Sequence, residues 1–207
     1  MKVVFDFGGV VFNWQPTQLL QQVLPHRAAD EAGGKAWATA IFQGFHPDSD
    51  WALFDQGGIT PAPLAQRIAR RTGLDTQEVA AVIDAIPSHL VPNPGTVALM
   101  DELRQQGHTL YYLSNMPASY ADELERSHHF FDWFDGGIFS ARVRQIKPNP
   151  DIFDTAVRRF ATQGAQVVFI DDVQRNLDAA RLHGWQGVRF ESADQARSDV
   201  LNLLRQP

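Results

Sequence analysis

The chain begins with a short apolar run that ends in one charged side chain. Residues 3–5 are apolar, Asp6 follows them, and Gly8 and Gly9 come soon after. An apolar run bounded by glycines predicts a buried strand that leads into a sharp loop. Burying an unpaired carboxylate is costly, so a carboxylate at this position needs a partner or a function. The pattern therefore makes Asp6 the first candidate functional residue.

From about residue 14 to residue 88 the apolar positions have helical spacing, and no strand-like alternation interrupts them. Thr60 and Asp75 each begin a predicted helix, and Glu78 completes a capping box with Asp75. We expect an all-helical cap inserted after the first strand. The predicted segments are core residues 1–13, cap residues 14–88 and core residues 89–207.

After Pro94, stretches with helical spacing alternate with short apolar stretches. Strands that alternate with helices in this way pair in parallel, so the predicted fold is an α/β fold with a doubly wound parallel sheet. Such sheets bind ligands at the carboxyl ends of their strands. Asp6, Ser114 and Asp172 should share that edge. The later strands are expected at residues 109–113, 138–139, 167–170 and 187–190.

Composition excludes several classes of partner and site. Acidic residues outnumber basic ones by 24 to 18, and no dense block of Lys or Arg occurs, so nucleic acid is not an expected partner. The absence of cysteine excludes disulfides and thiolate chemistry, and it favours a reducing cytoplasmic location. No stretch has the length of a membrane span, so no membrane association is expected. Both a monomer and a homodimer remain open.

The polar residues at the predicted strand ends suit displacement at phosphorus. Asp6, on an open glycine loop, could attack phosphorus and form a covalent acyl phosphate. Lys147 could neutralise the nucleophile and a phosphate oxygen, with the following proline fixing the backbone. Ser114 and Asn115, with the amide groups that start the next helix, would hold other phosphate oxygens.

A magnesium site is expected at the same edge. Asp6 and Asp172, with a backbone carbonyl of the loop at Gly8, form the oxygen-only ligand set that Mg²⁺ prefers. Asp171 would be a supplementary ligand or would support the others. Each motif also has an ordinary explanation as a helix start, a surface turn or an N-cap. Their order, with each following a predicted strand, favours a functional site.

Together the motifs resemble all four motifs of the haloacid dehalogenase superfamily, whose members are mostly phosphatases. The insertion lies where members carry a helical cap of the first type. The resemblance implies that Asp6 is the nucleophile, that Ser114 and Lys147 are the phosphate and charge partners, and that Asp172 is a ligand of Mg²⁺. It also implies a small phosphorylated metabolite as substrate. Asn176 stands where many members have another acidic residue.

One position departs from the pattern of phosphatases in this superfamily. They usually carry a second aspartate two residues after the nucleophile, which protonates the leaving alcohol and later activates water. Gly8 stands there in this chain. The Asp-Phe-Gly-Gly-Val form is similar to the subgroup of bacterial α-D-glucose 1-phosphate phosphatases. Because an anomeric hydroxyl is a good leaving group, we predict small phosphate monoesters, with sugar 1-phosphates as candidate substrates.

Two other functions are weighed. L-2-haloacid dehalogenases also lack the acid at the Gly8 position and use an aspartate nucleophile without metal, but the acidic pair Asp171 and Asp172 favours a cation. A non-catalytic member that binds a phosphorylated ligand would explain Gly8, whereas retention of Asp6, Lys147 and Asp172 disfavours it. A nicotinamide-binding enzyme is disfavoured because no Gly-x-Gly-x-x-Gly motif follows the first strand.

The face of the cap that closes over Asp6 should set specificity. Trp51 is the candidate for substrate contact, although packing of the cap core by Trp51 and Phe54 is the commoner role for large aromatic residues. The other candidates on this face are Phe45, His46, Asp50 and Asp55.

Overall fold

The computed structural model describes residues 1–163 and 166–205. Among these residues five strands form one parallel sheet in the order β3-β2-β1-β4-β5, which confirms the predicted fold class. The first strand is central because it pairs with β2 on one side and β4 on the other. The strands are β1 (Lys2–Phe5), β2 (Thr109–Ser114), β3 (Gly136–Phe139), β4 (Val167–Asp171) and β5 (Gln186–Arg189).

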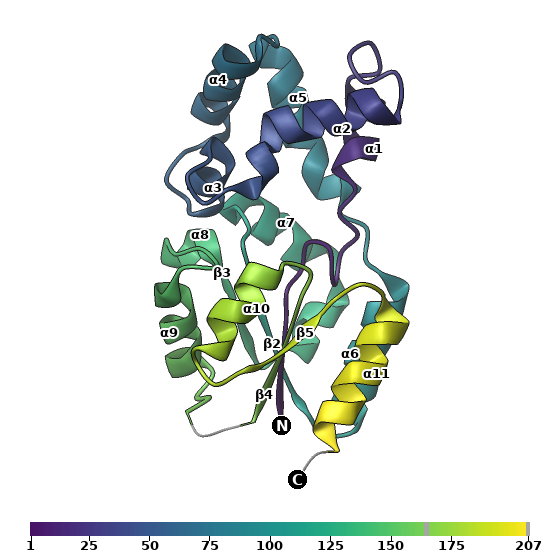
Figure 1. Cartoon of the computed structure of the whole chain (residues 1–207), viewed down its shortest axis with the longest axis vertical. Helices are drawn as coiled ribbons and strands as arrows, with labels where there is room; N and C mark the ends of the chain where they lie inside the picture. The colour runs from purple at the N-terminus through teal and green to yellow at the C-terminus, as the bar shows by residue number, and fades with distance from the viewer. Residues whose placement is uncertain (164–165, 206–207) are drawn as a thin grey trace.

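Helices cover both faces of this sheet (Figure 1). Successive residues of β1 point to opposite faces, so Val3 and Phe5 join one apolar cluster and Val4 joins the other. Burial on both faces explains why the strands are continuous apolar runs rather than alternating ones. The core helices are α6 (Pro94–Gln105) and α11 (Ala193–Leu204) on the first face, α9 (Pro150–Arg159) and α10 (Gln174–Arg181) on the second, and α7 (Ala118–Ser127) and α8 (Ser140–Val143) towards the cap, with a 3₁₀ turn at His129–Trp133.

The segment between β1 and α6 is helical and lies above the carboxyl edge of the sheet, at the end of the molecule opposite the two termini (Figure 1). Its helices pack as two pairs, α1 with α2 and α4 with α5. No helix within 1–163 and 166–205 is long and apolar enough to cross a membrane. The cap helices are α1 (Pro16–Val23), α2 (Glu31–Phe42), α3 (Asp50–Asp55), α4 (Pro61–Thr72) and α5 (Thr76–His89), with a 3₁₀ turn at Gln43–Phe45.

Direct hydrogen bonds join the cap to the core. Ser140 Oγ at the start of α8 donates to the carbonyl of Asp55, and Gln56 Nε2 donates to the carbonyl of Arg144 at 3.0 Å. Gly57 lies against the same helix in a left-handed conformation, with φ of 74°, and a Cβ there would come within 3.0 Å of the Ala141 carbonyl oxygen. The turn after α3 therefore requires glycine and is held close to the core.

Several predicted boundaries differ slightly from the structure. β2 continues to Ser114, β3 begins at Gly136, β4 continues to Asp171, and β5 begins and ends one residue earlier than expected. Helix α10 ends at Arg181, and the residue that follows it, Leu182, is 83% exposed. Trp185 is buried, and its ring packs against those of Phe153 and Phe169.

We predict that Asp75→Ala lowers the free energy of unfolding by about 1 kcal/mol. The Asp75 carboxylate accepts a hydrogen bond from Gln77 N at 2.7 Å, and Glu78 Oε2 accepts one from Asp75 N at 2.9 Å, so the capping box at the start of α5 is complete. Thr60 occupies the same position before α4 but makes no capping hydrogen bond through its side chain. Thr60→Ala is therefore the matched control and should cost less than about 0.5 kcal/mol in urea unfolding. Equal losses for the two variants would contradict this account.

Candidate active site

The carboxyl edge of the sheet forms the floor of a cavity of about 300 Å³ that the cap covers. Asp6 follows β1, Ser114 ends β2, and Asp172 follows β4. The predicted site residues that line this cavity are Asp6, Gly8, Trp51, Ser114, Asn115, Lys147 and Asp172. Asp171 is fully buried beside the floor rather than part of its lining.

Lys147 lies between two carboxylates at this floor. Its Nζ is 2.9 Å from Asp6 Oδ2 and 2.7 Å from Asp171 Oδ2, and its side chain is 1% exposed. Burial alone would lower the pKa of Lys147, but the carboxylates of Asp171 and Asp6 outweigh burial and raise this pKa above its ordinary value. The ammonium group therefore stays charged, and it holds the two strand ends at a fixed separation.

Asp171 uses both of its oxygens inside the protein. Oδ2 accepts from Lys147, while Oδ1 accepts from Val173 N at 2.8 Å. Asn176 Nδ2 lies 3.0 Å from each of the two oxygens. The amide of Asn176 donates to the Asp171 carboxylate, whereas a carboxylate at position 176 would repel it. These contacts favour a supporting role for Asp171 over direct ligation of Mg²⁺. This supporting role stays a prediction.

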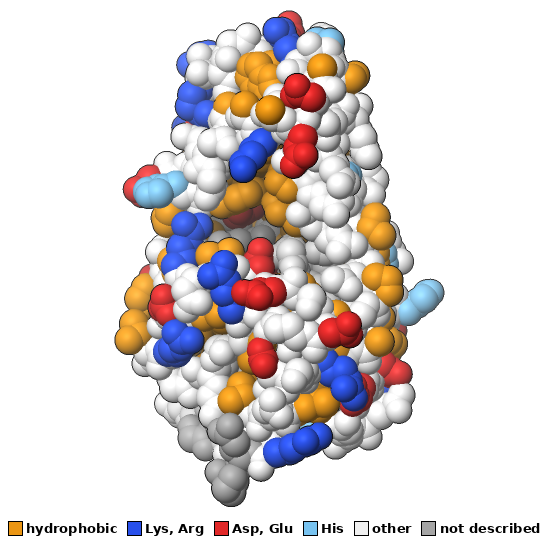
Figure 2. Space-filling view, turned by 45° about the vertical axis from the view of Figure 1, so that its right-hand side comes forward, with side chains coloured by type: hydrophobic (Ala, Val, Ile, Leu, Met, Phe, Trp, Pro, Cys, Tyr) orange, Lys and Arg blue, Asp and Glu red, His pale blue; other side chains and the backbone are white. Residues whose placement is uncertain are grey.

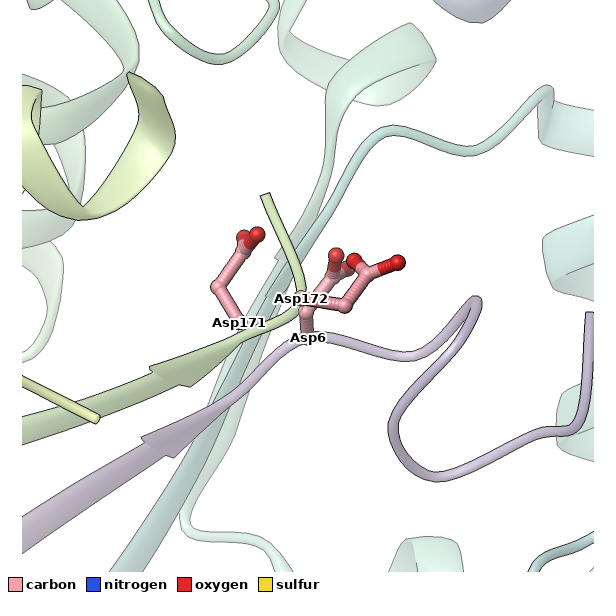
Figure 3. A group of neighbouring side chains, drawn as sticks. All are labelled: Asp6, Asp171 and Asp172. Carbon is pink, nitrogen blue, oxygen red and sulfur yellow. The ribbon is translucent and has the colours of Figure 1, made fainter. Parts of the chain in front are cut away.

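Asp6 and Asp172 are less completely neutralised. Oxygens of Asp6, Asp171 and Asp172 lie within 4.8 Å of one another at the ends of β1 and β4 (Figure 3). Burial raises the pKa of Asp6 to about 7, with Lys147 opposing and the neighbouring aspartates adding to the shift. Burial and Asp171 likewise raise the pKa of Asp172 to about 6. A divalent cation would relieve this repulsion, and carboxylate oxygens suit Mg²⁺.

The glycine loop brings the backbone close to these carboxylates. Gly9 has φ of 80°, a left-handed backbone conformation that favours glycine, and a Cβ there would lie 2.5 Å from Asp172 Oδ2. At Gly8 a Cβ would meet nothing within 4 Å. Space for a side chain therefore exists at position 8, but this chain places no acid there.

Asn115 serves the backbone of Lys147. Its Nδ2 donates to the Lys147 carbonyl at 2.9 Å, and its Oδ1 accepts from Lys147 N at 2.8 Å. Both polar ends of the amide are thus occupied, which favours a positioning role over the predicted contact with substrate. The preceding hydroxyl, Ser114, is 1% exposed at the cavity floor.

The cap contributes an apolar wall to the cavity. Figure 2 shows a hollow between cap and core where hydrophobic side chains gather. Trp51 lines the cavity and also packs in the cap core, with its ring 4.7 Å from that of Phe42, so both of its predicted roles are compatible with its position. Phe45 lines the wall as well, whereas Asp50 pairs with arginines of α4 and His46 is exposed outside the cavity.

Asp55, the last residue of α3, is the one acidic side chain among the described cap residues that line the cavity. It is 7% exposed. Burial and the charge of Asp6 raise the pKa of Asp55 well above its usual range, with Lys147 opposing. The surroundings of this side chain therefore favour the neutral carboxyl group over the carboxylate.

Three residues near the site had not been identified from the sequence. Ser140 Oγ accepts from Met116 N at 2.8 Å and also donates to the cap. Arg175 Nη2 donates to the Phe45 carbonyl at 2.7 Å, and Tyr120 OH donates to the Ile83 carbonyl at 2.7 Å. All three join the core to the cap or to the loop after β2. No local sequence pattern marks such long-range contacts.

Comparison with known proteins places this geometry in a family. A sesquiterpene phosphatase from Aspergillus oryzae is 29% identical over 187 residues, which cover 90% of this chain and 88% of that protein. A HAD family enzyme from Bacteroides thetaiotaomicron, solved with magnesium and inorganic phosphate, has 21% identity and a TM-score of 0.66 over 91% of this chain and 92% of its own. The L-2-haloacid dehalogenase from Xanthobacter autotrophicus, solved with chloropropionic acid covalently bound, has 19% identity and a TM-score of 0.67 over 100% and 84% of the two chains.

A sequence model of the haloacid dehalogenase-like hydrolases matches residues 3–184, which is most of the chain. The match includes the glycine loop, the cap, the strand ends that carry Ser114 and Asp172, and the loop between α8 and α9 that carries Lys147. The prediction that Lys147 follows a strand is wrong, because α8 separates it from β3. It confirms the superfamily predicted from the motifs. This protein belongs to the haloacid dehalogenase-like hydrolase family.

Proposed function

We propose that the protein is a magnesium-dependent phosphatase that hydrolyses small phosphate monoesters through a phospho-aspartate at Asp6. The observation that carries this proposal is the position of Lys147, whose buried ammonium group lies 2.9 Å from Asp6 at the floor of the cavity between cap and core. A fixed positive charge beside the nucleophile lowers the repulsion between a carboxylate and an approaching phosphate dianion.

The proposed reaction has two displacements. An oxygen of Asp6 attacks phosphorus, the bond to the ester oxygen breaks, and the leaving alkoxide takes a proton to become the alcohol. Water then attacks the phosphorus of the phospho-aspartate and gives up a proton, which releases inorganic phosphate and restores the carboxylate. Magnesium, held by Asp6, Asp172 and the carbonyl at Gly8, would supply positive charge to the phosphoryl oxygens.

Other residues have supporting roles in this proposal. Ser114, beside the nucleophile, donates its hydroxyl to a phosphate oxygen. Asn115 and Asp171 position Lys147, since each makes direct hydrogen bonds to it. Residues 14–88 act as the cap, with Trp51 contacting the organic part of the substrate.

The relatives support phosphate chemistry. The Aspergillus protein is named a phosphatase, and the Bacteroides enzyme was solved with magnesium and phosphate together. The dehalogenase likeness is a likeness of fold at 19% identity. Among the described residues that line the cavity, the cap contributes no arginine or lysine that could hold a substrate carboxylate. The acidic pair at the end of β4 also favours a cation, so we favour the phosphatase.

We predict that Asp6→Asn abolishes magnesium-dependent release of phosphate from p-nitrophenyl phosphate, with a loss of at least about 10³-fold in kcat, because the amide is not a nucleophile. Release is measured with and without magnesium. The exposed Asp48→Asn is the matched control and should keep full activity, since its side chain is 93% exposed. If a folded wild-type protein releases phosphate from no ester, the protein is a phosphoryl-ligand binder rather than an enzyme, and the proposal fails.

We predict that magnesium stabilises the protein more at about pH 8 than at about pH 5. The raised pKa values of Asp6 and Asp172, about 7 and about 6, mean that the folded metal-free protein holds protons that the unfolded chain has already released. The stability that these two protons contribute is therefore present at low pH and is lost as pH rises through 6 and 7. Magnesium competes with the same protons, so its effect on Tm should grow over this range. Asp172→Asn should shrink this gain, and a magnesium shift that is constant with pH would contradict the assignment.

A further inference from the structure

The wall of the cavity that faces the nucleophile is almost entirely apolar. Aromatic rings and aliphatic side chains make up most of it. They include Trp14, Phe45, Trp51, Ile86, Leu90 and Met116. Apolar walls of this kind bind apolar groups because contact removes surface from water on both sides.

Polar groups on this wall are few, and most are already occupied. Among the described cap residues that line the cavity, Asp55 has the one ionisable side chain. The hydroxyl of Tyr120 donates to the Ile83 carbonyl, and Arg175 donates to the Phe45 carbonyl. A sugar that enters this space would bury several hydroxyl groups with few partners, and each unpaired hydroxyl costs roughly a tenfold loss of affinity or more.

We propose that the organic part of the substrate is a compact apolar group, so that the enzyme hydrolyses the phosphate monoester of an apolar alcohol rather than a sugar phosphate. This inference rests on the proposed phosphatase function and replaces sugar 1-phosphates as the expected substrates. A cavity of about 300 Å³ lies at the small end of ligand sites and also has to hold the phosphate, which limits the size of the apolar group.

The test compares two esters that have the same reacting bond. Cyclohexylmethyl phosphate and glucose 6-phosphate are both phosphates of a primary alcohol on a six-membered ring, so their leaving groups are similar and their hydroxyl groups differ. We expect kcat/KM for cyclohexylmethyl phosphate to be at least about 100-fold higher. In a series from ethyl to hexyl phosphate, kcat/KM should rise about fourfold per added CH₂ until the cavity is full.

The outcomes separate this inference from the function on which it depends. The proposal of an apolar substrate fails if kcat/KM for glucose 6-phosphate equals or exceeds that for cyclohexylmethyl phosphate. It also fails if kcat/KM does not change from ethyl to hexyl phosphate. Either result would leave the proposed phosphatase function intact. If p-nitrophenyl phosphate is not hydrolysed either, the phosphatase proposal itself fails.

A second inference comes from the combination of Gly8 and Asp55. An acid at position 8 would have protonated the leaving oxygen, and the space beside Gly8 is open. Asp55 enters the same cavity from the cap and is close enough for the charges of Asp6 and Lys147 to act on it. The hydrogen bonds from Ser140 to the Asp55 carbonyl and from Gln56 to the Arg144 carbonyl fix the turn that carries Asp55 on the core.

We propose that the Asp55 carboxyl group donates a proton to the leaving oxygen as the bond between this oxygen and phosphorus breaks. The resulting carboxylate then accepts a proton from the water that attacks the phospho-aspartate. The cycle consumes one ester and one water, releases one alcohol and one inorganic phosphate, and returns Asp55 to its protonated form. The raised pKa of Asp55 supports this role, because a donor has to be protonated when the ester binds.

Asp55→Asn tests the proposal, because the variant keeps the size of the side chain and removes the acid. A simple alkoxide needs a proton to leave, whereas p-nitrophenolate leaves as a stable anion. We expect Asp55→Asn to lower kcat/KM, which reports the steps up to formation of the phospho-aspartate, about 10²- to 10³-fold for hexyl phosphate and less than about threefold for p-nitrophenyl phosphate. Retained activity on the nitrophenyl ester also shows that the variant is folded.

Equal losses on both esters would overturn the proposal, because Asp55 would then act on folding or binding rather than on the leaving group. No loss on either ester would also overturn it. Absence of activity in the wild-type protein on both esters would instead refute the proposed phosphatase function.

Discussion

The ion pairs of Lys147 are the interaction on which the rest of the site depends. Three carboxylates from two neighbouring strand ends come within 4.8 Å of one another, and their mutual repulsion would separate these ends without a positive charge between them. Removing one partner from a buried ion pair costs about 3–5 kcal/mol, because the remaining charge stays buried. Asn115 holds the lysine backbone and Asn176 holds Asp171, so neutral amides complete a network whose centre is one ammonium group.

The two parts of the molecule contribute different chemistry to one cavity. The sheet edge supplies a charged floor, because the strands end together and leave polar groups there. The cap supplies an apolar wall above this floor. A setting of lower polarity strengthens the electrostatic interactions at the floor. The end of α3 is hydrogen-bonded to the start of α8, and Arg175 donates to the Phe45 carbonyl. These contacts hold the cap in a fixed position relative to the core.

Because Gly8 carries no acid, the cap bears on the protonation of the leaving group as well as on specificity. An acid on the glycine loop would belong to the floor, and Gly8 places no carboxyl group there. Good leaving groups would remove the need for one, which is the reasoning that favours sugar 1-phosphates. The apolar wall and the buried Asp55 favour the opposite solution, in which an apolar alcohol leaves with a proton that comes from the cap.

The sequence alone determined the fold and the floor of the site. Strand-end positions such as Asp6, Ser114 and Asp172 were predictable because parallel pairing brings the carboxyl ends of strands together, and the capping box at Asp75 is a local pattern. Only the tertiary structure decided that Asn115 binds the lysine backbone, that Asp50 turns away to α4, and that Asp55 enters the cavity. These outcomes depend on how the cap helices pack against the core. Packing across such sequence separations leaves no periodicity in the chain, so local patterns carry no record of it.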